Sequence, residues 1–352
     1  MKGGGFPPLA DVLRLNGLAG KREHPFPNDG WSGAAMTLLH RGSERFVLKR
    51  DSFKRDWIAQ ATADGPVLRE AWFAAHGPRL PAPLRAPYLG VGQDEATFGI
   101  LMPDLTGVLF DWDAPIGVEQ LERVLGGLAE LHGYPWIISG ELAETALWCP
   151  IRERISLICR SSLERPGPNR DAVADRLLPG WDAWDRVATT GARDVIAALS
   201  DDPQPLIDAL EAQPSTLIHG DLKLANVGIE PDGSIVLVDW QMVMVAPVAI
   251  ELGWFLVSNV ASLPLPTAEV IDRYRSKLAY SISEAEDDGR WVGGAELDED
   301  GVNAAILVGL LLRGWRKGMD AEAGITLGSG ISARDDLAWW CDRAVEAADR
   351  LL

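Results

Sequence analysis

The segment from residue 216 to 240, TLIHGDLKLANVGIEPDGSIVLVDW, constrains this chain more than any other. An apolar run leads to Asp221, Asn226 follows five residues later, and a second apolar run ends at Asp239. The sequence Pro-Asp-Gly at 231–233 lies between the runs, and Asp-Gly in such a place is a strong hairpin signal. The segment therefore predicts a loop, a β-hairpin and a second carboxylate at the end of a strand.

Phosphoryl transfer is a reaction that needs these groups in this order. The protein must hold a hydroxyl in line with the γ-phosphate and neutralise charge through Mg²⁺. Asp221 can accept or orient the hydroxyl proton, while Asn226 and Asp239 can supply the hard oxygen ligands that Mg²⁺ prefers. An ordinary surface hairpin would explain any one of these residues, but the whole set in order favours the catalytic reading.

This part of the sequence resembles the catalytic core of the aminoglycoside phosphotransferase family, through His219-Gly220-Asp221-Leu222, Asn226 and Val238-Asp239-Trp240. The resemblance implies a protein-kinase-like fold, ATP or GTP as phosphate donor, and Mg²⁺. Lys223 matches the catalytic loop of protein kinases and, by that resemblance, contacts the transferred phosphate. Glu251, twelve residues past Asp239, stands where the family usually has an Asp that braces the catalytic loop.

The residues that would hold the phosphates come from the first part of the chain. The run 45–49 predicts a strand that ends at Lys49, and a helical pattern 21 residues later carries Glu70. This spacing is typical of a strand lysine that clamps the phosphates of a nucleotide and a helix glutamate that orients the lysine. A lone lysine at a strand end is ordinarily solvated. Small residues such as Ser32 and Gly33 let a backbone approach phosphates, and a plain hairpin turn is the alternative.

Two strands within 88–102, joined by a polar turn at 92–95, lead to Met102, Pro103 and Leu105. By the resemblance this is the hinge between two lobes, where backbone groups hold the adenine. Pro103 lacks an N–H but offers its carbonyl, and Leu105 can donate its N–H. A linker without nucleotide contacts fits the same residues.

The predicted fold class is α+β, in a bilobal protein-kinase-like arrangement. Residues 1–105 form a small N-lobe with an antiparallel sheet plus a helix, and it ends in the hinge. Residues 106–352 form a larger, mostly helical C-lobe that contains the catalytic loop at 217–240 and substrate-binding helices. Apolar residues at helical spacing predict a long helix at 117–133. His132, near its end, is predicted to pack or cap rather than to act as a base.

Further helices are predicted at 157–163, 172–178, 192–210, 268–281, 302–315 and 335–352. The acidic run at 283–300 predicts a solvated loop, with an acidic rim that attracts a cationic acceptor as the alternative. Asp182, Asp185 and Asp194 fit solvated faces and substrate ligands equally well.

Composition excludes several partners. A net charge of −18 over 352 residues disfavours nucleic acid and anionic membranes as partners, because both need a basic face. The same charge suits a cationic acceptor such as an amino sugar, although plain solubility also explains it. No signal peptide and no run long enough to span a bilayer is visible. Three widely spaced cysteines without a CxxC predict a reducing cytoplasm, and we expect a monomer or homodimer.

The sequence therefore predicts an ATP- or GTP-dependent phosphotransferase that acts on a hydroxyl of a small molecule. Antibiotic resistance by phosphorylation is an expectation for the family, and a kinase of choline-, homoserine- or sugar-like metabolites is the alternative. A non-catalytic pseudokinase would be expected to lack Lys49, Asp221, Asn226 or Asp239, and all four are present. A protein kinase is disfavoured because HGD and DWQ replace HRD and DFG.

Overall fold

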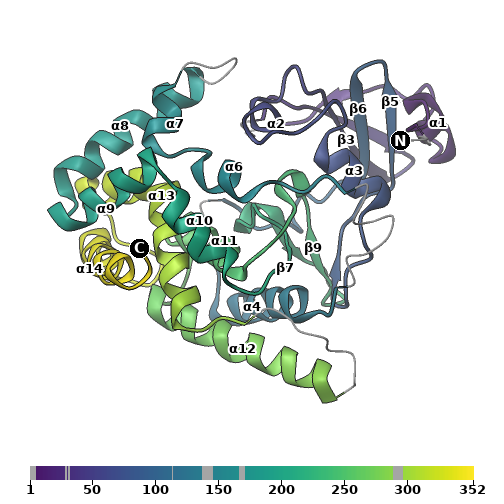
Figure 1. Ribbon diagram of the computed structural model, residues 1–352. Helices are drawn as coiled ribbons and strands as arrows, with labels where there is room; N and C mark the ends of the chain where they lie inside the picture. Colours follow the sequence, from purple (N-terminus) through teal and green to yellow (C-terminus); the bar gives the residue numbers. More distant parts are fainter. Residues whose placement is uncertain are drawn as a thin grey trace.

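The computed structural model describes residues 5–27, 30, 32–112, 114–136, 146–165, 171–287 and 296–352. Figure 1 shows an N-terminal part built on a β-sheet and a larger, mostly helical part that carries the C-terminus. The predicted α+β class with two lobes is confirmed. That the lobes divide between residues 105 and 106 stays a prediction.

A five-stranded antiparallel sheet is the framework of the described N-terminal part, with strand order β1-β2-β3-β6-β5. Its strands are β1 (His24–Pro25), β2 (Ala35–Arg41), β3 (Glu44–Asp51), β5 (Gly90–Asp94) and β6 (Thr97–Pro103). On the central strand, Lys49 lies opposite Met36 of β2 and Ile100 of β6. A strand with neighbours on both sides has a buried centre, and Lys49 is only 6% exposed.

The pleat of β3 decides which way Lys49 points, because successive side chains of a strand face opposite sides of the sheet. Leu48 belongs to the core between the sheet and helix α1 (Leu9–Leu15). Val47 belongs to the core on the other face, where helix α3 (Arg69–His76) packs. Lys49 is two residues past Val47, so its side chain lies on the α3 face. A short helix, α2 (Trp57–Ala61), precedes α3.

The catalytic segment forms two small β structures inside the helical part. The predicted hairpin is present as β8 (Val227–Ile229) and β9 (Ile235–Leu237), with β4 (Leu84–Arg85) added in parallel to β9. A second antiparallel pair joins β7 (Thr216–Ile218) to β10 (Met244–Ala246). These two pairs flank the loop that carries Asp221 and fix both of its ends.

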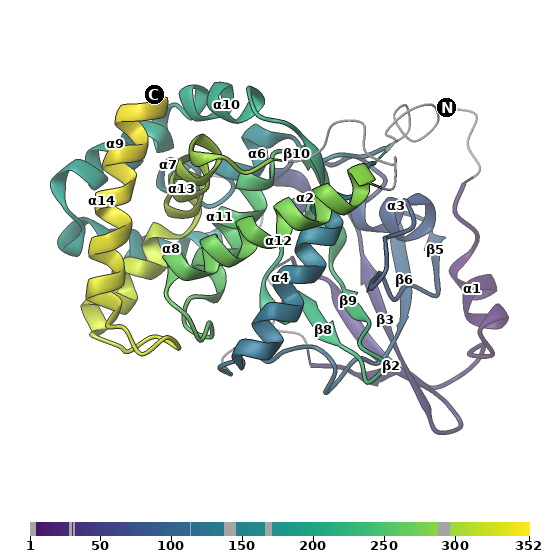
Figure 2. The same ribbon diagram turned by 90° about the horizontal axis from the view of Figure 1, so that it is seen from below.

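The remaining helices build the larger lobe. They are α4 (Val118–Gly133), α6 (Ile151–Ser156), α7 (Arg160–Glu164), α8 (Asp171–Val187), α9 (Thr190–Asp201), α10 (Gln204–Glu211), α11 (Val248–Asn259), α12 (Thr267–Asp287), α13 (Glu299–Ala323) and α14 (Ala333–Leu351). Helix α13 is central and packs against α8, α11 and α14, while α4 crosses α12 (Figure 2). An apolar helix such as α11 is stable only when buried on all sides, and nearly every residue of α11 is buried.

Two predicted helices are divided in the structure. The predicted helix at 157–163 straddles a break, because α6 ends at Ser156 and α7 begins at Arg160. The predicted helix at 192–210 is two helices, since α9 ends at Asp201 and α10 begins at Gln204. Pro203 lies at this second break, and proline cannot donate the backbone hydrogen bond that a helix interior requires.

The predicted turn at 92–95 lies later in the sequence. Strand β5 continues to Asp94, which pairs with Thr97, so the two-residue turn consists of Glu95 and Ala96. Glu95 takes a positive φ of 53°, as tight hairpins of this length require.

The prediction of a loop across the acidic run is wrong at both ends. Residues 283–287 belong to α12, and Glu299 begins α13. The Asp298 carboxylate caps α13 by accepting a hydrogen bond from the Gly301 N–H at 2.8 Å. The middle of the run, 288–295, lies outside the described residues, as do the predicted break at 166–168 and Trp31 of the predicted phosphate loop. No helix among the described residues is long and apolar enough to cross a bilayer.

We predict that Gly253→Ala destabilises the protein by about 1–3 kcal/mol, as overpacking of a close-packed core does. A methyl group at Gly253 of α11 would lie 2.3 Å from the Ala305 carbonyl oxygen of α13, so the two helices would have to separate. Gly126→Ala on α4 is the matched control, because its methyl would meet no atom within 4 Å. It should stabilise by roughly 0.5–1 kcal/mol. Urea unfolding of both variants measures the difference, and equal stabilities would contradict the helix contact.

Candidate active site

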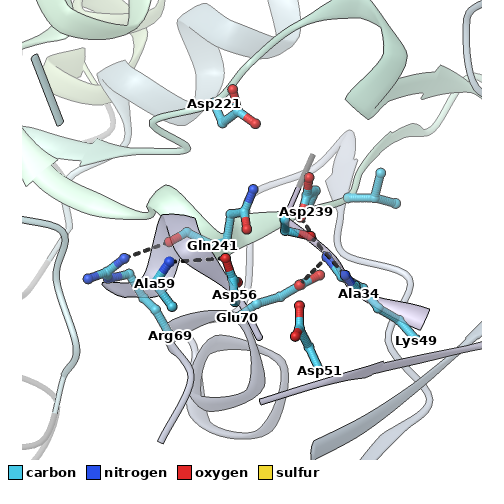
Figure 3. Close-up of polar contacts among 12 residues, drawn as sticks. Ala34, Lys49, Asp51, Asp56, Ala59, Arg69, Glu70, Asp221, Asp239 and Gln241 are labelled. Carbon is cyan, nitrogen blue, oxygen red and sulfur yellow. Dashed lines mark hydrogen bonds and ion pairs between the residues drawn. The ribbon is translucent and has the colours of Figure 1, made fainter. Parts of the chain in front are cut away.

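The side chain of Lys49 joins three separate elements (Figure 3). Its Nζ lies 2.6 Å from Glu70 Oε2 on α3 and 2.7 Å from Asp239 Oδ1, which follows β9. Tyr88 donates its hydroxyl to the other oxygen of Glu70 at 3.0 Å and fixes that carboxylate. The pleat of β3 and the position of α3 therefore bring Lys49 and Glu70 together in the way that the spacing predicts.

The charges in this group are unbalanced. Burial would lower the pKa of Lys49, but Asp239 and Glu70 raise it above its ordinary value, so the ammonium stays charged. Burial raises the pKa of Glu70. Burial opposes ionisation of Asp239 too, but Lys49 and Lys223 outweigh it and keep its pKa below the ordinary value. One ammonium between two carboxylates leaves a net negative charge, which suits a cation as a further ligand.

The loop before Asp221 is held by a single buried carboxylate. Glu251 of α11 is fully buried and accepts hydrogen bonds from the backbone N–H groups of His219, Gly220 and Leu222 at 2.6, 3.0 and 3.3 Å. Three N–H donors on one carboxylate fix the loop backbone in one conformation. Glu251 thus makes the kind of contact that the sequence predicts for it, although the family usually has Asp in this place.

Gly220 has a conformation that no other residue tolerates here. Its φ is +79°, and a Cβ would lie 2.0 Å from the Met242 carbonyl oxygen. His219 occupies the interior beside it, where its Nε2 donates to the Val238 carbonyl at 2.9 Å and its Nδ1 accepts from the Asp221 N–H at 3.2 Å. These bonds tie the loop to the end of the hairpin and require the Nε2-protonated tautomer.

His132 packs beside this brace, as predicted. Its Nδ1 lies 2.6 Å from the Tyr274 hydroxyl, and its Nε2 lies 3.6 Å from Glu251 Oε2. Burial alone would raise the pKa of Glu251, but interactions with His132, His219 and the loop backbone hold it below its ordinary value. The role of His132 is therefore to support the carboxylate of Glu251.

Asp221, Lys223 and Asn226 lie together in the loop. Asn226 Nδ2 donates to the Asp221 carbonyl at 2.9 Å and lies 3.4 Å from Asp221 Oδ2. Lys223 Nζ lies 3.4 Å from the same Oδ2. The Asn226 carbonyl accepts from the Val238 N–H at 3.0 Å, which links this group to the strand end at Asp239.

The turn at Asp239 is fixed by packing. Asp239 takes a left-handed conformation with φ 66° and ψ 57°, which non-glycine residues rarely adopt. The next residue, Trp240, is fully buried and stacks on Phe73 of α3 with ring centroids 4.1 Å apart. Backbone conformations of this kind concentrate at functional sites. The stacking holds the catalytic segment against the helix that carries Glu70.

The residues present fit a magnesium ion. Asn226 Oδ1 and Asp239 Oδ2 accept no hydrogen bond from the described residues, since the bonds of these side chains use Nδ2 and Oδ1. No group of three or more His, Cys, Asp and Glu side chains among the described residues could hold a metal. Mg²⁺ does not need such a cage, because it commonly binds one or two protein oxygens together with phosphates and water.

The residues predicted to contact the nucleotide lie in the segment before β2 and at the end of β6. Leu105 makes no hydrogen bond through its N–H within the described chain. Met102 and Pro103 lie at the end of β6, opposite Val47 and Phe46. In the predicted phosphate loop, Ser32 is buried and Gly33 has a φ of +92°. Their roles in nucleotide binding stay predictions.

Several polar residues near the site were missed by the sequence analysis. A cavity of about 10 Å³, room for about one water, is lined by Lys49, Glu70, Asp51, Asp56, Asp64 and Gln241 among others. Arg154 of α6 donates its Nε to the Gly220 carbonyl. Asp182 and Asp185 pair with Arg160 on the surface, as the solvated reading predicts. Nothing in the local pattern of 134–215 distinguishes Arg154 from surface arginines, so only the fold reveals it.

A buried Lys–Glu pair on a sheet, together with Asp, Asn and Asp on a hairpin, is an arrangement that serves phosphoryl transfer. The sequence model of the phosphotransferase enzyme family matches residues 24–285. The chain therefore belongs to this family, and it is a small-molecule phosphotransferase that uses a nucleotide donor. A search of curated proteins found no match.

Solved structures with a similar chain course include kinases of different small molecules. A spectinomycin phosphotransferase in complex with ADP and spectinomycin is 14% identical, with a TM-score of 0.47 over 97% of this chain and 96% of that chain. A choline kinase from Cryptosporidium parvum is 11% identical, with a TM-score of 0.47 over 97% and 96%. A macrolide 2′-phosphotransferase from Brachybacterium faecium is 16% identical, with a TM-score of 0.44 over 97% and 96%.

We predict that Glu251→Gln lowers both stability and turnover. The amide would present an NH₂ group to backbone donors and leave at least one of the three N–H groups unsatisfied. Breaking such a buried charged network costs about 3–5 kcal/mol. Urea unfolding and the rate of ADP release measure the two effects. Unchanged stability in Glu251→Gln would show that the carboxylate does not brace the loop.

We predict that Asp56→Asn reduces the pH dependence of stability. Burial and the charge of Asp51 raise the pKa of Asp56 to about 7. A carboxyl whose folded pKa is raised favours folding below its unfolded pKa, and this contribution is lost as pH rises through about 7. The Asp56 carboxylate caps α2 by accepting from Ile58 and Ala59, and Asn preserves that cap without charge.

The wild type should therefore lose roughly 2–3 kcal/mol of stability relative to Asp56→Asn between about pH 5 and pH 8. Urea unfolding of both proteins across this range measures the difference. Parallel pH profiles would show that Asp56 is ionised normally in the folded protein.

Proposed function

We propose that the protein transfers the γ-phosphate of ATP or GTP, with Mg²⁺, to an alcohol hydroxyl of a small molecule. The observation that carries the proposal is the joining of Lys49, Glu70 and Asp239 in one ion-paired group, tied through Val238 to the loop that holds Asp221 and Asn226. Nucleotide-binding groups and the acceptor-side carboxylate thus lie on one continuous framework.

Asp221 is the proposed base. The acceptor oxygen forms a bond to the γ-phosphorus, the bond between this phosphorus and the bridging oxygen breaks, and the nucleoside diphosphate leaves with that oxygen. The hydroxyl proton passes to the Asp221 carboxylate, which is 7% exposed and lies beside Lys223. Lys223, 3.4 Å from Asp221, stabilises charge on the transferred group.

Lys49, Asn226 and Asp239 are the proposed phosphate and metal residues. Lys49, oriented by Glu70, holds the α- and β-phosphates, and its ion pair with Asp239 is exchanged for phosphate oxygens when the nucleotide enters. Asn226 Oδ1 and the Asp239 carboxylate would hold the magnesium ion, which supplies neutralisation of phosphate charge when bound. Ser32 and Gly33 cover the phosphates, while Met102, Pro103 and Leu105 hold the base through backbone groups.

The biological setting is also part of the proposal. Three free cysteines, all buried, fit a reducing cytoplasm. A net charge of −18 argues against nucleic acid and membrane partners, and a monomer or homodimer is expected. The acceptor is an antibiotic, as in resistance by phosphorylation, or a metabolite. The long-range field of the chain favours a cationic acceptor, but the residues beside Asp221 decide which charge the pocket accepts.

We predict that Asp221→Asn lowers turnover by roughly 10²–10⁴-fold, the usual contribution of a general base. Nucleotide affinity should change little, because Lys49 and Asp239 remain. Release of ADP or GDP with a panel of hydroxyl-bearing antibiotics and metabolites measures turnover, and a fluorescent nucleotide measures binding.

Asp232→Asn is the matched control, because this exposed carboxylate lies in the hairpin turn, where it accepts from the Ser234 N–H at 2.9 Å. It should have wild-type turnover. Near-normal turnover in Asp221→Asn would remove Asp221 from the reaction.

A further inference from the structure

Two arginines and three tryptophans gather beside Asp221, and we refer to them as the Arg–Trp cluster: Arg154, Arg313, Trp112, Trp254 and Trp315. The Arg313 guanidinium lies 5.6, 5.6 and 5.2 Å from the ring centroids of Trp112, Trp254 and Trp315. Arg154 lies over the Trp254 ring at 4.6 Å. Trp254 therefore contacts both guanidinium groups, and the cluster is one connected unit from α6, α11, α13 and the segment before α4.

The cluster adjoins the proposed base. Arg154 donates its Nε to the carbonyl of Gly220, the residue before Asp221. Burial lowers the pKa of Arg154 and lowers that of Arg313 to about 10, and in both cases the negative charge of Asp221 acts in the opposite direction. Both arginines therefore interact electrostatically with the Asp221 carboxylate, which would receive the proton of the acceptor hydroxyl.

Arg313 is a buried cation with no carboxylate bonded to it within the described chain. It is 5% exposed and makes no hydrogen bond or ion pair among the described residues. Neighbouring cations on the same helix are paired: Arg316 lies 2.8 Å from Asp320, and Lys317 lies 2.5 Å from Asp336. Leaving a buried guanidinium unpaired is costly, because its hydration is lost and no carboxylate replaces it.

Other polar atoms of the cluster share this property. Arg154 Nη2 and Trp254 Nε1 are also buried without a hydrogen-bond partner within the described chain. Buried donors in folded proteins are almost always bonded, so several unbonded donors in one place need an explanation. Contact with tryptophan rings contributes about 0.5–2 kcal/mol but leaves the N–H donors of a guanidinium unbonded.

The backbone at Arg313 is also irregular. Helix α13 is kinked there, with φ −136° and ψ 21° at Arg313 in an otherwise helical segment. Kinks in buried helices have identifiable causes, and the next residue, Gly314, would bring a Cβ within 3.0 Å of Trp181. The kink places the guanidinium of Arg313 among the three tryptophans rather than along the regular helix surface.

We propose that the acceptor is a monoanionic hydroxyl compound whose carboxylate is bound by Arg313 and Arg154 and whose planar body lies against Trp112. This inference rests on the proposed phosphotransferase function. Arg313 has no bonded carboxylate within the described chain and Arg154 Nη2 is unbonded, so one carboxylate on the acceptor would supply the partner that these donors lack. A planar guanidinium matches a carboxylate in two parallel hydrogen bonds. Trp112 is 46% exposed and so offers a ring face at the rim of the cluster.

The proposal reverses the expectation that follows from net charge. A polycationic amino sugar would bring further positive charge to two buried guanidinium groups, and like charges repel most strongly where water is excluded. The charged neighbours of Arg313 are Arg316, Asp320 and Asp221. Asp320 is already paired with Arg316, so it offers no free carboxylate to a cationic substrate.

A matched set of three probes tests the proposal: 4-(hydroxymethyl)benzoate, the corresponding benzamide and the corresponding benzylamine. They share one body and one alcohol and differ only in charge. Binding to the full chain with Mg²⁺ and ADP present is measured by calorimetry. We expect the carboxylate to bind at least about tenfold more tightly than the amide, as charge-assisted hydrogen bonds do, and the amine to bind most weakly.

Arg313→Gln should weaken carboxylate binding at least about tenfold and leave amide binding within about twofold. Arg313→Lys keeps the charge and should retain part of the preference, because it loses the planar fork. Arg186→Gln, which removes an exposed arginine paired with Glu322, is the matched control and should behave as the wild type. Trp112→Ala, at an exposed position, should weaken all three probes alike.

Three results would overturn the proposal: tighter binding of the amine than of the carboxylate, equal carboxylate affinity in wild type and Arg313→Gln, or no saturable carboxylate binding by the wild type. Binding of Mg²⁺–ADP alone separates this inference from the proposed function. If the wild type does not bind Mg²⁺–ADP, the proposed phosphotransferase function is wrong. If it binds Mg²⁺–ADP but shows no preference for the carboxylate probe, only the proposed acceptor is wrong.

Discussion

The catalytic segment depends on the Glu251 carboxylate, which accepts three backbone N–H groups of the loop from inside the core. A buried carboxylate is unstable unless its oxygens are satisfied, and the loop backbone is unstable unless its N–H groups are. The loop N–H groups satisfy the carboxylate oxygens, and the carboxylate satisfies the N–H groups. The loop is therefore held in one conformation. Gly220 and His219 allow this close approach, because a side chain at 220 would collide with Met242 and the imidazole bridges to Val238.

Lys49 links this rigid loop to the sheet. Its ammonium contacts a carboxylate from each side, Glu70 from α3 and Asp239 from the hairpin, and stacking of Trp240 on Phe73 keeps the two elements together. The pairing satisfies Lys49 while no nucleotide is bound, yet it leaves surplus negative charge. In the proposed function, a metal ion and phosphates would take over these pairs, so that Lys49 and Asp239 keep oppositely charged partners.

The sequence predicts most of this framework because local rules agree with the fold there. The Asp-Gly turn predicts the hairpin, the 21-residue spacing from strand to helix predicts the pairing of Lys49 with Glu70, and the resemblance to the family assigns the brace to Glu251. Prediction fails where two local signals disagree or where the pattern carries none. The apolar spacing at 192–210 continues through Pro203, so one helix was expected where two exist. Arg154 and Arg313 have the sequence context of ordinary helix residues, and only tertiary packing places them beside Asp221.

Net charge is the other point at which sequence and structure lead to different conclusions. Interactions of solvent-exposed charges are largely screened by dissolved ions beyond about 8 Å at physiological salt. A ligand in contact with Arg313 lies well within that distance. Its affinity is therefore set by its direct contacts rather than by the net charge of the chain. An acidic protein can therefore select an anionic acceptor, because its surface sets the field for approach and its buried arginines set the affinity.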